Sequence, residues 1–158
     1  MNDQIFKIIL TNTYTLAQLK KRVRVLKDYL ISQLFNESRP SLNEKDLAYL
    51  RSLEPSFYQQ FNKDNLYPIF ADLEKRISQF IPLYLYLPFE TDDQVTSQIG
   101  LFIQKTYGKL ILFDVKYDPA LIAGCSISWQ GIYRDYSLRK KIEDRKQEIL
   151  SILKGFLK

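Results

Sequence analysis

The sequence predicts an α+β protein: a small N-terminal helical bundle followed by a small mixed α/β domain with the order strand-helix-strand-strand-strand-helix. Residues 1–80 carry apolar side chains at spacings of three and four between short polar loops, which is typical of packed amphipathic helices. After Pro82 the pattern changes, because Leu83–Leu87 alternates leucine with tyrosine, the two-residue period of a strand. We therefore expect two domains, residues 1–80 and residues 81–158.

The first domain is expected to hold five helices. The second of them runs from about residue 16 to residue 35, and Thr13 or Thr15 can cap it. Ser41 with Glu44 forms a capping box ahead of a short third helix. The remaining helices are expected at residues 2–10, in a short segment after Pro55, and at residues 66–80.

The second helix carries an apolar stripe with spacings of three and four residues. Its members are Leu16, Leu19, Val23, Leu26, Leu30 and Leu34. Such a stripe buries itself either against the rest of its own domain or against a helix of another protein. We favour the core of the domain, and the contact with a partner helix is the alternative.

The second domain begins with the strand at residues 83–87. Thr91 and Gln94 form a capping box for a helix that ends at Gly108 and turns four apolar residues inward: Val95, Ile99, Phe102 and Ile103. Residues 109–117 alternate again and predict a second strand, parallel to the first because a helix joins them. A hairpin of two short strands and a helix at residues 138–158 complete the domain.

The hairpin lies inside the most informative stretch of the chain, residues 118–139. Asp118 and Pro119 open a turn, and Gly124 lets the backbone approach a neighbouring segment closely. Residues 125–129 alternate as a strand whose apolar face holds Cys125, Ile127 and Trp129, and we expect Trp129 in the core. Gln130 and Gly131 supply a two-residue turn with positive φ at the glycine. Asp135 or Ser137 caps the final helix.

Composition excludes several chemistries. The 158 residues include one cysteine and no histidine, which removes an internal disulfide, the common general base and the usual nitrogen-sulfur metal sites. No glycine-rich phosphate loop is present. We expect no cofactor and no catalysis by this chain alone, although catalysis by carboxylates stays open. No secretory signal or membrane-spanning stretch is evident, so we expect a soluble or peripheral protein inside the cell.

The net charge of +5 is concentrated in two helices. Residues 16–34 carry five basic residues and one acidic residue, and residues 138–158 carry seven basic and three acidic residues. Such helices indicate acidic partners or an anionic membrane surface nearby, and simple solvated faces are the alternative. Because the pI is about 9.2, a basic nucleic-acid-binding module is also conceivable. The tyrosines are scattered and no recognition motif is present, so we expect no nucleic acid.

The C-terminal half resembles the C-terminal domain of the δ subunit of F-type ATP synthases, called OSCP in mitochondria. Nine residues occupy positions that match the family motif: Asp118, Pro119, Leu121, Ile122, Gly124, Gly131, Asp135, Ser137 and Arg139. Ala123 and Tyr136 stand where the family has glycine, which requires negative φ at both positions. The order of elements from residue 81 also agrees with the family. The E subunits of V/A-type ATPase stalks carry a similar turn and hairpin.

The resemblance implies a non-catalytic subunit of the peripheral stalk (stator) of a proton-translocating ATP synthase. Its family partners are the N-termini of the F1 α subunits, gripped by the helical domain, and the C-termini of the b subunits. The subunit is then present as a single copy in a hetero-oligomer, peripheral to the cytoplasmic face of the cell membrane. In this chain the expected helical domain is shorter than the family's six-helix bundle. Ile149 and Leu153 on the last helix could contact a partner helix.

Overall fold

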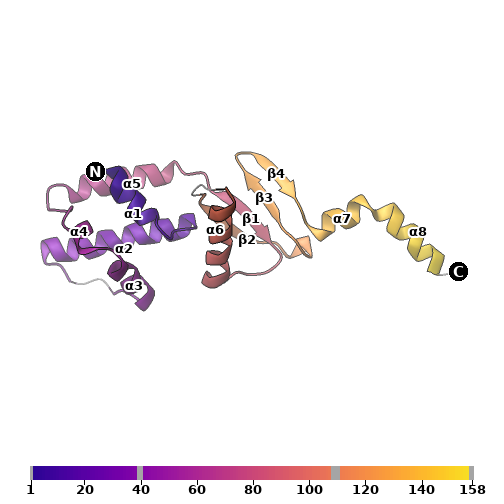
Figure 1. The fold of residues 1–158 in the computed structure, drawn as a ribbon, viewed down its shortest axis with the longest axis horizontal. Helices are drawn as coiled ribbons and strands as arrows, with labels where there is room; N and C mark the ends of the chain where they lie inside the picture. The colour runs from indigo at the N-terminus through magenta and orange to yellow at the C-terminus, as the bar shows by residue number, and fades with distance from the viewer. Residues whose placement is uncertain (1, 39–40, 108–110, 157–158) are drawn as a thin grey trace. The chain divides into compact units, whose positions relative to one another are not determined.

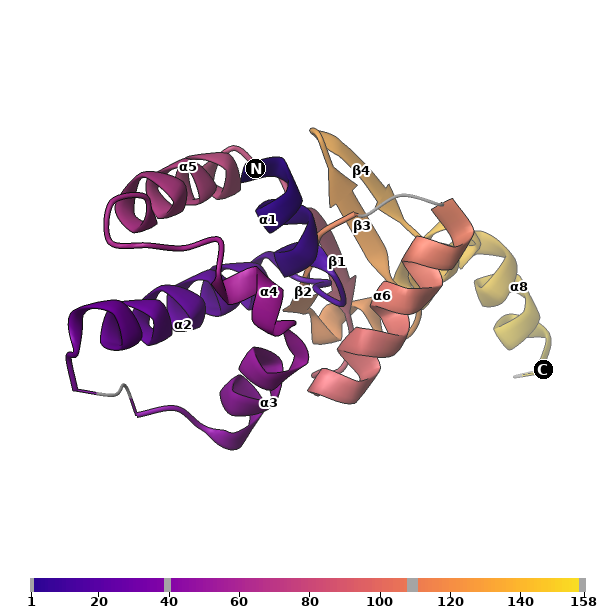
Figure 2. The ribbon, with the colours of Figure 1, turned by 60° about the vertical axis from the view of Figure 1, so that its left-hand side comes forward.

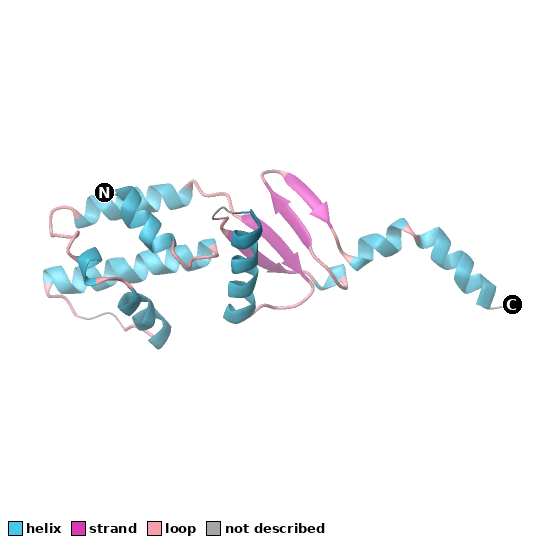
Figure 3. Ribbon diagram, viewed as in Figure 1, coloured by secondary structure: helices cyan, strands magenta, loops and turns pink. Residues whose placement is uncertain are grey.

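The computed structural model describes residues 2–38, 41–107 and 111–156, and the chain has an α+β fold with an N-terminal helical region. Its contacts separate it into two compact units, Met1–Phe80 and Ile81–Lys158, the same division that the composition change at Pro82 predicts. Helices alone build the first unit, whereas the described strands all lie in the second (Figure 3). Each unit is described by itself below.

The described residues of the helical unit form five α-helices (Figure 1). They are α1 (Asn2–Leu10), α2 (Leu16–Phe35), α3 (Glu44–Ser52), α4 (Pro55–Tyr58) and α5 (Leu66–Ser78). Thr15 caps α2 with a complete capping box: its hydroxyl accepts from the Gln18 amide at 3.0 Å, and the Gln18 side chain accepts from the Thr15 amide. Asn36 ends the helix in the left-handed conformation. The prediction of a threonine cap for this helix is thereby confirmed at Thr15.

The core of the helical unit forms where α1, α2 and α5 pack against one another (Figure 2). Its fully buried side chains are Ile5, Ile9, Leu19, Leu26, Leu66, Phe70 and Leu73. The rings of Phe57, Phe61 and Phe70 form a chain of contacts with centroids 5.4 and 5.9 Å apart, which joins α4 to α5. Because each buried leucine or phenylalanine contributes about 1.5–3 kcal/mol, this cluster is the main source of stability in the unit.

The predicted start of α3 is wrong by two residues. Asn43, rather than Ser41, is the N-cap, and its side chain accepts a hydrogen bond from the amide of Asp46 at 2.8 Å. Serine and asparagine are comparable caps, so local chemistry does not favour Ser41 over Asn43 two residues later.

The second unit is built around a four-stranded mixed sheet with the order β2-β1-β3-β4. Its elements are β1 (Leu83–Leu87), α6 (Asp93–Tyr107), β2 (Phe113–Tyr117), the 3₁₀ turn η1 (Pro119–Leu121), β3 (Ser126–Trp129), β4 (Ile132–Asp135), α7 (Leu138–Asp144) and α8 (Lys146–Phe156). The strands β1 and β2 are parallel and the hairpin strands are antiparallel, as the sequence predicts. The predicted helix stop at Gly108 lies outside the described residues.

Two predictions about α6 are wrong in detail. Asp92, rather than Thr91, caps the helix, since its carboxylate accepts from the amide of Val95 at 2.8 Å. Phe102 is 67% exposed instead of facing inward. Ile99 and Ile103 are half-buried, and Gly100 is the buried position between them. The inward face is therefore rotated toward the glycine.

Trp129 does not lie in the core; it is 40% exposed. The pairing of β3 with β1 ends at Ser128, so Trp129 pairs only with Ile132 on the outer strand β4. In place of Trp129, Ser126 is the buried end of β3, where the strand lies between β1 and β4. For this strand, alternation of apolar and polar residues predicts the wrong buried face, because Ser126 is buried whereas Cys125 and Ile127 are only half-buried. Alternation also does not show how far the neighbouring strand extends.

Candidate functional site

Eight of the nine residues of the sequence motif lie around one corner of the second unit, formed by residues 118–124 and 135–139, and the ninth, Gly131, lies in the hairpin turn. We call this corner the turn–helix corner. Asp118 begins it: the amide of Asp118 donates to the carbonyl of Leu87 at 2.8 Å, and its carboxylate accepts from the amide of Ala120 at 3.0 Å. Pro119 opens η1, and Leu121 is fully buried against α7. The turn is therefore tied to the end of β1 and to the first C-terminal helix.

Gly124 marks the place where the two halves of the corner touch. Its φ is +83°, and a Cβ atom at this position would lie 2.5 Å from the carbonyl oxygen of Tyr136. The same two segments exchange backbone hydrogen bonds, from the amide of Tyr136 to Cys125 at 2.9 Å and from the amide of Leu138 to Ala123 at 2.8 Å. Glycine is thus required twice, by its torsion and by the close approach.

The backbone conformation of Ile122 is not predictable from the sequence. Its φ of 67° and ψ of −55° define a γ-turn, closed by the amide of Ala123 donating to the carbonyl of Leu121 at 2.8 Å. This turn is strained, above all for a β-branched residue, and the side chain is 58% exposed. The corner therefore holds an apolar side chain at its surface at the cost of backbone strain.

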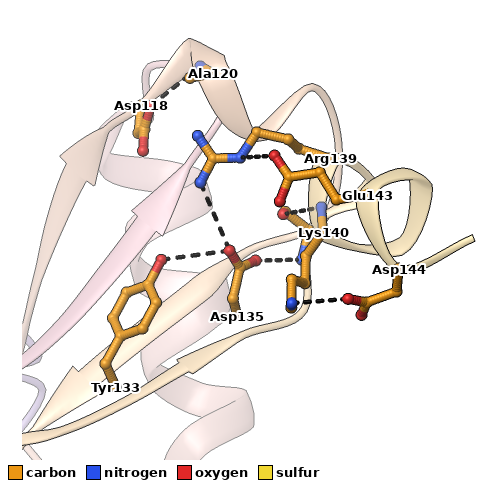
Figure 4. Close-up of polar contacts among 9 residues, drawn as sticks. Asp118, Ala120, Tyr133, Asp135, Arg139, Lys140, Glu143 and Asp144 are labelled. Carbon is orange, nitrogen blue, oxygen red and sulfur yellow. Dashed lines mark hydrogen bonds and ion pairs between the residues drawn. The ribbon is translucent and has the colours of Figure 1, made fainter. Parts of the chain in front are cut away.

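Asp135 and Ser137 fix the start of α7 (Figure 4). Ser137 is fully buried and its hydroxyl accepts from the amide of Lys140 at 3.1 Å, while the carboxylate of Asp135 accepts from the amide of Ser137 at 2.8 Å. The hydrogen bonds from Ser137 hold the pKa of Asp135 below its ordinary value, and the guanidinium of Arg139, 3.7 Å away, acts in the same direction. The carboxylate is accordingly a fixed anion that organises the helix start.

The hairpin turn at Gln130 and Gly131 has positive φ at both residues, 50° and 80°. Such a pair suits the twist of a two-residue hairpin loop, which is why glycine is favoured in it. In contrast to Gly124, Gly131 is surrounded by open space. Glycine is therefore favoured at position 131 only because of the positive φ.

The last helical stretch is two helices, not the single helix predicted at residues 138–158. Arg145, with φ of −108° and ψ of 18°, separates α7 from α8. The described part of α8 has no buried residue, and Leu153 is 52% exposed. Ile149 is half-buried. The exposed large apolar side chains of the two helices are Leu138, Ile142, Leu150, Ile152 and Leu153. With Ile149 we call them the C-terminal apolar face.

The apolar stripe of α2, for which contact with a partner helix was the alternative interpretation, lies in the core of its own unit. Leu16, Leu19, Val23, Leu26 and Leu30 are all buried, none more than 8% exposed. Because α1, α3 and α5 pack on α2, these side chains form the core of the helical unit. They are unavailable to a partner helix, and the core interpretation of the stripe is the one that the structure supports.

The basic residues of α2 are largely neutralised within the unit. Lys21 pairs with Asp46 at 2.7 Å, Arg24 with Asp28 at 3.8 Å, and Lys27 with Glu74 at 2.8 Å. On α7, Arg139 and Lys140 pair with Glu143 and Asp144 in the same way. Much of the positive charge predicted for these two surfaces is therefore compensated inside the chain.

Cys125 is half-buried, and burial raises the pKa of its thiol. A raised pKa keeps the thiol protonated and a poor nucleophile at neutral pH. Within residues 2–38, 41–107 and 111–156, no group of three or more histidine, cysteine or acidic side chains is placed to hold a metal ion.

No protein-family model matches this chain, and no curated protein matches it. Among the described helices, none combines the length and the apolar character that a membrane span requires.

Proposed function

We propose that the chain is a peripheral-stalk subunit of a rotary ATP synthase, similar in role to the δ subunit and OSCP, and without catalysis of its own. A stator must hold the catalytic head still while the rotor turns, which requires a rigid fold and surfaces for other helices. In this proposal the C-terminal apolar face takes the C-termini of the b subunits, and the helical unit contacts the F1 α subunits. The chain then works as a single copy, peripheral to the cytoplasmic face of the membrane.

The observation that carries the proposal is that the start of α7 is held firmly by its contacts, whereas the apolar side chains of α8 are exposed. Buried Ser137, the ionised Asp135 and the close approach at Gly124 anchor the start of α7. Beyond that anchor, none of the described apolar side chains of α8 is buried: Ile149 is half-buried, and Leu150, Ile152 and Leu153 are exposed. An amphipathic helix held at one end and apolar along one side suits lateral packing against another helix.

The E-like stalk subunit of a V/A-type ATPase stays as the alternative in the same class, because the turn and hairpin are features that both families share. The ion pairs within α2 and α7 weigh against a nucleic-acid-binding module. Phosphate binding depends on unneutralised lysine and arginine, and five of the cations on these helices already have carboxylate partners.

The test is binding of the full chain to the b subunits and to the catalytic hexamer of the same organism, measured by co-elution and sedimentation velocity. The double variant Ile149→Glu/Leu153→Glu should bind the b subunits at least tenfold more weakly, because two carboxylates would be desolvated at the contact. The matched control Gln147→Glu/Ser151→Glu adds the same charge to exposed polar positions of the same helix and should bind like the parent. A parent chain that binds neither the b subunits nor the hexamer would end the proposal.

A further inference from the structure

The helical unit contains a cleft of about 700 Å³. Residues of α1, α2, α3 and α4 line it, and its apolar surface includes Ile8, Ala48, Leu53 and Phe57. The volume falls in the range of ordinary ligand-binding clefts, large enough for several side chains. The cleft lies wholly within residues 1–80.

Arg22 of α2 reaches into this cleft and is held there by three contacts. Its Nη1 atom donates to the carbonyl of Thr11 at 2.9 Å and to the hydroxyl of Thr13 at 2.6 Å. The guanidinium carbon lies 4.7 Å from the centre of the Tyr49 ring, a cation–π contact. Thr13 is itself fully buried, so the anchor of the guanidinium is rigid.

The remaining donors of this guanidinium are free. Both hydrogen bonds use Nη1, and neither Nε nor Nη2 has a partner among the described residues. These two atoms form the edge that binds a carboxylate through two parallel hydrogen bonds. Lys21, Arg24 and Lys27 of the same helix each have a carboxylate partner, whereas Arg22 has none within the described chain.

A half-buried cation without a carboxylate partner is energetically unfavourable. Burial lowers the pKa of Arg22 from its ordinary value. Tyr49, on the wall of the cleft, has a buried hydroxyl with no hydrogen-bond partner in the described chain. The guanidinium of Arg22 gains from a ligand that brings an acceptor into the cleft.

We infer that this cleft binds a segment of a partner protein in which an aspartate or glutamate side chain lies among apolar residues, and that Arg22 receives the carboxylate. The free edge of the guanidinium matches one carboxylate, and the apolar wall matches the side chains beside it. Lys45 and Glu54 also line the cleft, and their formal charges cancel, so the net charge of the lining is that of one cation. A phosphate group fits less well, because phosphate sites usually combine several cations or backbone amides. The inference does not depend on the C-terminal apolar face, which carries the stator proposal.

The experiment uses a displayed library of random 12-residue peptides selected against the full chain. Enriched peptides should carry an acidic residue flanked by apolar ones, and the best should bind with an affinity that drops at least tenfold when that residue is changed to its amide. Arg22→Met should lose the same binding at least tenfold. Arg22→Lys, which keeps the charge but lacks the planar edge, should lose less.

Arg24→Met is the matched control, since Arg24 is two residues away on α2 and its side chain is 84% exposed. It should bind the selected peptide like the parent. The thermal unfolding of each variant, followed by circular dichroism, separates loss of binding from loss of fold, and Arg22→Lys keeps the test valid if Arg22→Met unfolds. The inference is overturned if no acidic peptide is enriched, or if a folded Arg22→Met binds as tightly. It is also overturned if 1 mM inorganic phosphate displaces the peptide fully, because the cleft would then be a simple anion site.

Discussion

Two amphipathic helices, α2 in the first unit and α8 in the second, differ in how far their apolar side chains are buried. Leu19 and Leu26 of α2 are fully buried, because α1, α3 and α5 supply surfaces that cover them. Leu150 and Leu153 of α8 are exposed, since α7 alone packs closely against that helix among the described elements. The same apolar periodicity thus indicates only that one face of a helix is apolar and is stabilised by burial. Whether the cover comes from the chain itself depends on how many neighbours the fold provides.

The largest expected effect follows directly from this contrast. Leu26→Ala should lower the free energy of unfolding of the helical unit by about 2–5 kcal/mol, because it leaves a cavity in a fully packed core. Leu153→Ala should change stability by less than about 0.5 kcal/mol, because the side chain is already half in water. Urea unfolding followed by circular dichroism at 222 nm measures both changes. A large loss from Leu153→Ala would show that α8 is packed in solution and would abolish the distinction between the helices.

A second comparison concerns Gly124 and Gly131, both of which have positive φ. Gly131→Ala should cost about 1–2 kcal/mol, the usual price of a left-handed torsion for a residue with a Cβ atom. Gly124→Ala should cost about 1–3 kcal/mol more, because the added atom also overlaps the carbonyl of Tyr136. Chemical unfolding of the two variants measures the difference. Equal losses would mean that residues 123–125 and 136–138 do not approach each other closely in solution.

The turn–helix corner shows which features a sequence carries and which it does not. Gly124 and Gly131 were predictable, because glycine signals torsions that other residues avoid. The γ-turn at Ile122 was not, since a β-branched residue at positive φ contradicts local preference and only the surrounding contacts impose it. The apolar periods likewise predicted the order of helices and strands. The break at Arg145 was missed, because no proline or glycine marks it.

The cleft with Arg22 shows the same limit in the helical unit. In the sequence Arg22 is one of five cations on a basic helix, and nothing local distinguishes it from Lys21 or Arg24. Its partners Thr11, Thr13 and Tyr49 come from other parts of the chain and meet it only in the folded unit. A count of charged residues therefore overestimates how much of the positive charge of α2 lacks a carboxylate partner. It also does not distinguish Arg22, which lines a cleft, from the other cations of the helix.

The smallest expected effect concerns a carboxylate in each unit, Asp3 in the helical unit and Asp135 at the turn–helix corner. The pKa of Asp3 is lowered by its hydrogen bond and ion pair with Arg76, and that of Asp135 mainly by its hydrogen bonds with Ser137. A carboxylate with a lower pKa in the folded state stabilises the fold above its unfolded pKa of about 3.9. That contribution is lost as the pH falls through the lower, folded value.

The two carboxylates differ in how they should respond to salt. The Asp3–Arg76 pair is an exposed ion pair and should be screened, so its pKa should rise toward the ordinary value in 1 M NaCl. The hydrogen bond from the backbone amide of Ser137 is screened less, so Asp135 should keep a lowered pKa in the same salt. Carbon-13 NMR of the carboxyl groups between pH 2 and pH 6 measures both titrations. Asp135→Asn supplies the assignment control, and an Asp135 titration that moves to the ordinary value in salt would make Arg139, not Ser137, its principal partner.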